Sequence, residues 1–173
     1  MCSSLAFTSG GAIDQLNVIF LTMAYEYKKH AMVDGKKYGP SPGNKYYQPA
    51  GYHNPVKKQH NKGRKAKKAE HEDKTHWILN KSQQYDVFLE GESNEFIDQS
   101  GIFSLLDNCN EILGQDGERL AIFETPMNAN DAWHGYPFFS KDEYKLTDEM
   151  VDKFKEKEKI SIANYTRLLA RKI

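Results

Sequence analysis

Residues 119–124 read RLAIFE, and our prediction of the fold starts from this short stretch. Its apolar, β-favouring residues predict a strand. Pro126 ends it, because proline does not continue a strand ladder. The turn signal QDG at 115–117 precedes it. We therefore expect a small antiparallel sheet built around this strand.

The segments before this strand complete half of the expected core. Residues 85–90 (YDVFLE) read as a second short strand of the sheet. Residues 101–113 carry Phe103, Leu105 and Leu106, and we expect them to form a helix that ends at Gly114.

The residues after the strand predict a polar loop and two helices. Asn128 to Asp131 read as the loop, and WHGYPFF at 133–139 as an irregular aromatic segment. Thr147 can cap a helix running through Lys159, and Ser161 a second one through Ala170. Residues 160–173 read alternatively as a final strand. The pair has the rhythm of a helix-turn-helix but lacks its turn glycine, so two packed helices without DNA binding are favoured.

The N-terminal part divides into an apolar segment and an irregular one. Residues 12–33 repeat apolar side chains every three or four positions, which predicts a buried helix that belongs to the core. Residues 34–74 contain four prolines and predict a long basic loop or arm. We therefore expect one α+β domain: the 1–33 region, the arm, and a compact body at 75–173. Its small antiparallel sheet packs with three to four helices.

The bulk composition excludes several classes of protein. A chain of 173 residues with 12% aromatic residues can bury a core. Its two cysteines are no disulfide framework, which indicates a reducing compartment. The longest apolar run, residues 18–21, is too short to cross a membrane. We expect a cytoplasmic protein without a membrane partner.

The basic residues are concentrated in one segment of a neutral chain. Residues 28–68 hold twelve lysines and arginines against one acidic residue, Asp34. From residue 75 onward there are eleven basic and eighteen acidic residues. A local excess of positive charge is an electrostatic footprint for an anion.

Basic side chains neutralise phosphates, and tyrosine rings offer stacking faces for bases. The segment therefore predicts a nucleic-acid partner, more specifically RNA or single strands. Two readings remain open beside it: pairing with the protein's own acidic half, or with a protein partner. The latter describes a non-enzymatic interaction protein, such as a phage, defence or toxin-system component. The candidate binding residues are Tyr46, Tyr47, Tyr52, Lys57, Lys58, Lys62, Arg64, Lys65, Lys67 and Lys68.

The WHGYP segment is the best candidate for catalysis. A histidine beside a glycine in a loop is accessible, and His134 can act as a general acid or base in metal-free cleavage of RNA. Arg119, Glu124 and Tyr136 are the residues that we expect to support it. The alternative is a turn whose aromatic side chains pin the loop to the core.

Four histidines also cluster in and just after the basic segment: His53, His60, His71 and His76. Their spacing does not suit a metal. His71 and His76 are five residues apart, whereas a helical pair of zinc ligands needs four. The two cysteines are not spaced to complete a site. We therefore expect no metal and no other cofactor.

Overall fold

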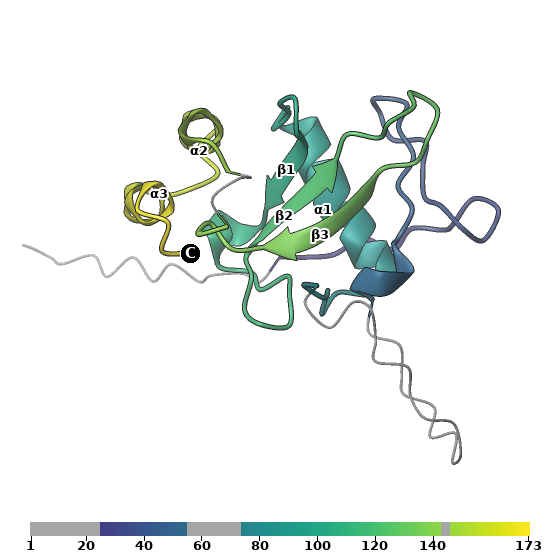
Figure 1. The fold of residues 1–173 in the computed structure, drawn as a ribbon, viewed down its shortest axis with the longest axis horizontal. Helices are drawn as coiled ribbons and strands as arrows, with labels where there is room; N and C mark the ends of the chain where they lie inside the picture. The colour runs from purple at the N-terminus through teal and green to yellow at the C-terminus, as the bar shows by residue number, and fades with distance from the viewer. Residues whose placement is uncertain (1–24, 55–73, 143–145) are drawn as a thin grey trace, which may run out of the picture.

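A computed structural model describes residues 25–54, 74–142 and 146–173. Its centre is an antiparallel sheet of three strands in the order β1-β2-β3. Figure 1 shows α1 behind this sheet and the pair α2 and α3 together at one end. The expected α+β class is confirmed.

The predicted strand at 119–124 is the central strand of the sheet. β2 (Leu120–Glu124) pairs with β1 (Gly101–Leu105) on one side and with β3 (His134–Phe138) on the other. β3 replaces the irregular segment that we expected there. Pro137 is compatible with this strand, because β3 lies at the edge of the sheet, where a missing N–H is tolerated.

The expected helix at 101–113 is wrong, because its first five residues form β1. All five are buried: Phe103 and Leu105 face the core on the α2 side, and Ile102 faces α1. A strand buried on both faces is a continuous apolar run, which periodicity does not distinguish from a helix. A 3-10 turn, η2 (Asp107–Cys109), follows it and contains the buried Cys109.

The expected strand at 85–90 is also wrong, because these residues lie inside helix α1 (Lys81–Ser93). A capping box starts this helix: the Asn80 side chain accepts from the backbone N–H of Gln83, and the Gln83 side chain accepts from the backbone N–H of Asn80. At Gly91 the helix touches β1 so closely that a Cβ would lie 2.3 Å from the carbonyl oxygen of Phe103.

Both predicted caps at the C-terminal end are confirmed. Thr147 accepts from the backbone N–H of Met150 and starts α2 (Asp148–Glu156). Ser161 accepts from the backbone N–H of Asn164 and starts α3 (Ile162–Leu169). The final segment is therefore a helix and not a strand.

The sheet separates two apolar cores. On one face Ile102, Ala121 and Phe123 pack with α1 and with aromatic side chains of flanking segments. On the other face Phe103, Leu120, Ile122 and Phe138 pack with residues of α2 and α3.

Residues 25–33 are extended along α1, so the expected helix is wrong for this part of 12–33. Side chains of α1 bind the backbone here: Lys28 N–H donates to Asp86 (2.5 Å) and His30 N–H donates to Ser82 (2.8 Å). These contacts take the place of the i−4 carbonyls that a helix would supply. Residues 12–24 lie outside the described residues.

The first part of the expected arm packs against the body. Tyr38 and Tyr47 are buried in the core beside α1, and the Lys45 ammonium pairs with the buried Glu92 carboxylate at 2.9 Å. Residues 34–54 are therefore anchored to the body at Tyr38, Lys45 and Tyr47. The rest of the arm, 55–73, lies outside the described residues.

No helix in the described ranges has both the length and the apolar character needed to cross a membrane.

Candidate acid–base cleft at the open end of the sheet

One face of the β2–β3 hairpin changes from apolar to polar along its length. Leu120 pairs with Phe138, Ile122 with Tyr136, and Glu124 with His134. Residues two apart on a strand share a face, so these pairs lie on the face that α2 and α3 cover. Leu120, Ile122 and Phe138 are buried there, whereas Glu124 and His134 are exposed.

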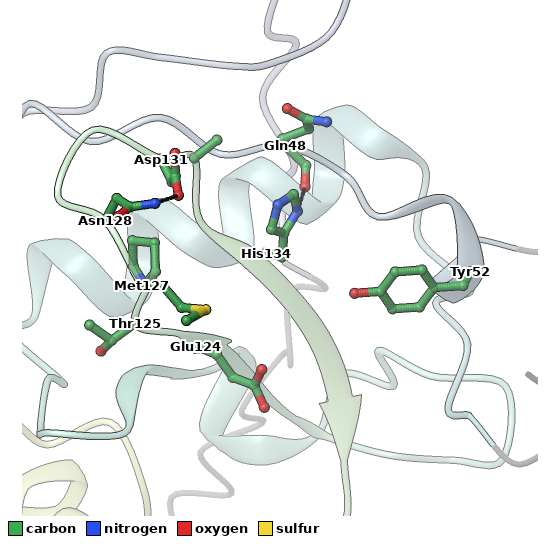
Figure 2. Close-up of a pocket in the computed structure, with 10 residues that line it drawn as sticks. Gln48, Tyr52, Glu124, Thr125, Met127, Asn128, Asp131 and His134 are labelled. Carbon is green, nitrogen blue, oxygen red and sulfur yellow. Dashed lines mark hydrogen bonds between the residues drawn. The ribbon is translucent and has the colours of Figure 1, made fainter.

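Two adjoining cavities of about 530 and 450 Å³ open at this polar end. Both are lined by Tyr52 and Glu124, so they are parts of one cleft. Figure 2 shows the larger cavity, with Tyr52 across from His134 and Glu124. We call this space the sheet-end cleft, and the lining residues that matter below are Tyr52, His53, Lys74, Glu124, His134 and Tyr136.

The backbone fixes the His134 ring. Its Nδ1 lies 2.7 Å from the carbonyl oxygen of Gln48, as Figure 2 shows, so Nδ1 carries the proton and donates it. Nε2 makes no hydrogen bond to any described residue. This nitrogen is therefore the one that can exchange a proton with a ligand in the cleft.

Glu124 and Tyr136 form a hydrogen-bonded pair beside His134. The Tyr136 hydroxyl donates to Oε1 of Glu124 at 2.5 Å. Burial, and then this bond to the carboxylate, raise the pKa of Tyr136 well above its ordinary value. The phenol therefore stays protonated and acts as a donor, not as a base.

His53 is the functional candidate that sequence reasoning missed. Its ring stacks on that of Tyr136, with centroids 4.8 Å apart and planes at 26°. Its Nδ1 lies 2.7 Å from the Thr75 carbonyl oxygen, to which it donates. Burial lowers the pKa of His53, which favours the neutral ring near pH 7. The sequence signal was present only as one member of a histidine cluster.

Lys74 contributes a positive charge to the lining of the cleft. Its ammonium lies 5.1 Å from the centre of the Tyr52 ring. Among the described lining residues Lys74 is the one lysine or arginine, against Glu124, Asp131 and Asp142. The described walls thus carry more negative than positive side chains, and strong affinity for an anion needs a further basic element.

Such a basic element is attached to the cleft through the chain itself. Tyr52 and His53 line it just before residues 57–68, and Lys74 and Thr75 line it just after them. The His53–Thr75 hydrogen bond ties these two ends together, as does the bond from Trp77 N–H to the His53 carbonyl (3.0 Å). The candidate side chains at 57–68 lie outside the described residues; they are Lys57, Lys58, Lys62, Arg64, Lys65, Lys67 and Lys68.

Three of the expected site residues do not line the cleft: Arg119, Tyr46 and Tyr47. Arg119 precedes β2 at the opposite end, where its guanidinium donates to the carbonyls of Cys109 and Asn110. Five residues of strand place its backbone about 16 Å from that of Glu124. Tyr47 is fully buried and donates to Gln84 at 2.8 Å, so its ring belongs to the core and offers no stacking face.

Tyr46 lies beside the body under Lys37, whose ammonium is 4.1 Å from its ring centre. Of the three tyrosines expected to stack on bases, Tyr52 is the one that lines the cleft.

Within residues 25–54, 74–142 and 146–173, no three His, Cys, Asp or Glu side chains are grouped so as to hold a metal ion. Comparison of the chain with protein-family models, with curated proteins and with solved structures finds no match to any of them.

Proposed function

We propose that this protein binds RNA or other single-stranded nucleic acid and cleaves it in the sheet-end cleft by metal-free acid–base chemistry. The observation that carries the proposal is that the described residues on either side of 55–73 line the sheet-end cleft: Tyr52 and His53 before it, Lys74 and Thr75 after it. The seven basic residues of 57–68 are joined to these lining residues along the chain.

The described residues supply the parts that such a reaction needs. Cleavage of a phosphodiester without a metal requires proton acceptors and donors and a cation near the phosphate. His134 presents Nε2, and Lys74 is a cation in the same cleft. The partly exposed Tyr52 supplies an aromatic side chain to the cleft wall, and nucleic-acid bases stack on such rings.

Binding is tested by fluorescence anisotropy of a labelled single-stranded RNA at about 50 and 200 mM salt. Seven phosphate contacts predict an affinity loss of about a thousandfold over this range, since each contact releases condensed counterions. Changing all seven basic residues of 57–68 to Gln is expected to remove this steep dependence and the tight binding at low salt.

A matched control changes Lys153, Lys155 and Lys157 of the α2 region to Gln. These residues lie outside the cleft, so affinity should fall far less. Equal binding by the 57–68 variant and the unmodified protein contradicts the proposal, as does no binding at low salt. The latter result assigns the basic segment to a protein partner or to the acidic half of the chain.

Cleavage is tested on the same RNA with EDTA present. His134→Asn keeps a side-chain N–H donor for the Gln48 carbonyl but removes the imidazole. We expect the rate to fall about 100-fold or more, the usual contribution of an acid–base group. An unchanged rate removes His134 from the reaction.

A further inference from the structure

We propose that His53 is the second acid–base residue of the cleft, that it acts as general base while His134 acts as general acid, and that the substrate is RNA with a free 2′-hydroxyl. This inference rests on the proposed function and makes it specific. The sequence did not single out His53 for catalysis; its position against Tyr136 does.

The two imidazoles flank the Glu124–Tyr136 pair. His134 and Tyr136 are two residues apart on one face of β3, which separates their backbones by about 7 Å. His53 stacks on the Tyr136 ring with centroids 4.8 Å apart. His134 lines the larger of the two cavities and His53 the smaller one, and the two cavities share Tyr52 and Glu124.

Both rings are held in the same way. In each, Nδ1 donates to a backbone carbonyl at 2.7 Å: Thr75 for His53 and Gln48 for His134. In each, Nε2 makes no hydrogen bond to a described residue. Backbone carbonyls thus fix both tautomers and leave two Nε2 atoms for proton transfer.

Their surroundings assign the two roles. His53 is buried, and burial lowers its pKa, with Lys74 and His76 acting in the same direction. The Thr75 carbonyl and the Glu124 carboxylate oppose this effect but do not outweigh it. A neutral imidazole is the form that accepts a proton. His134 is exposed and pairs with Glu124 in the register of β2 and β3, so solvent reaches the residue that we assign as the acid.

The reaction balances without a co-reactant. Nε2 of His53 takes the proton of the ribose 2′-hydroxyl, and the 2′-oxygen forms a bond to phosphorus. The bond from phosphorus to the 5′-oxygen breaks, and protonated His134 delivers its Nε2 proton to that oxygen. The products are a 2′,3′-cyclic phosphate and a 5′-hydroxyl. Lys74 lies where it can neutralise charge on the phosphate.

The first test compares His53→Asn, His134→Asn and the control Glu156→Ala on single-stranded RNA with EDTA. Asparagine places an N–H donor where Nδ1 stood, so the bond to the Thr75 carbonyl is retained. Circular dichroism and urea unfolding verify that each variant is folded. We expect both cleft variants to lose about 100-fold or more in rate. Glu156 is exposed and lies outside the cleft, so Glu156→Ala should cleave like the unmodified protein. DNA of the same sequence should not be cleaved.

The second test separates base from acid with uridine 3′-(4-nitrophenyl phosphate), whose leaving group needs no proton. On this substrate the cleavage rate of His134→Asn should return close to that of the unmodified protein. The rate of His53→Asn should stay as low as it is on RNA. The inference is overturned if the rate of His53→Asn returns to normal on this substrate, or if folded His53→Asn cleaves RNA at the full rate. Either result leaves the proposed function standing. No cleavage of RNA by the unmodified protein overturns both.

Discussion

The two ends of the β2–β3 hairpin carry the same face of the same sheet but have opposite characters. At the end with Leu120 and Phe138, helices α2 and α3 cover the face and no polar side chain is needed. At the end with Glu124 and His134 the strands carry exposed ionisable groups beside two cavities.

The contrast between the two ends shows how a small sheet combines stability with a reactive site. Apolar area removed from water stabilises the fold at one end. At the other end the same strands hold side chains rigidly while their tips remain accessible. We expect substitutions at the covered end to change stability, and substitutions at the open end to change activity.

The largest effect is expected from Phe154→Ala at the covered end. Phe154 is fully buried and meets the Phe96 ring edge-to-face at 4.7 Å. Removing the ring should lower the free energy of unfolding by about 3–5 kcal/mol. Urea denaturation measures this change, with the exposed Glu156→Ala as control, expected within about 0.5 kcal/mol. A loss below about 1 kcal/mol would mean that α2 does not seal this end.

A smaller effect is expected at the start of α3. Ser161→Ala removes the side-chain oxygen that accepts from Asn164 N–H at 3.3 Å. The expected cost is about 1 kcal/mol in the free energy of unfolding, the usual value for a lost N-cap. Ser161→Asp keeps an acceptor and should retain most of the stability. Equal losses in both variants would assign the effect to something other than the cap.

The smallest effect on stability is expected at the open end. His134 is exposed, so His134→Asn should change the free energy of unfolding by no more than about 0.5 kcal/mol while cleavage falls. Urea denaturation and the RNA assay are run on the same preparation. A loss above about 1 kcal/mol would favour the alternative that the WHGYP segment only pins the chain to the core.

The sequence correctly predicted those elements whose formation depends on a few neighbouring residues. The strand at 119–124 and the caps Thr147 and Ser161 were predicted, because turn residues and capping side chains act within a few positions. Residues 85–90 were expected to form a strand but lie in helix α1, and residues 101–113 were expected to form a helix but begin with strand β1. Their side chains are buried on more than one face, so their apolar pattern carried no clear period.

The residues of the candidate site were likewise predicted only in part. The sequence pointed to His134, Glu124 and Tyr136 through the accessible WHGYP motif and the strand before it, and to the basic segment through charge alone. It included Arg119 because that residue is near in sequence, whereas the strand carries it to the far end of the sheet.

By itself the sequence determined the α+β composition, the central strand, the helix caps and the concentration of positive charge, because each follows from neighbouring residues. Packing of the whole chain, by contrast, places Tyr47 in the core, stacks His53 on Tyr136, and brings Tyr52, His53, Lys74 and Thr75 to one cavity. Those facts join residues about 80 positions apart, such as His53 and Tyr136, and pairing over such separations is set by packing of the whole chain.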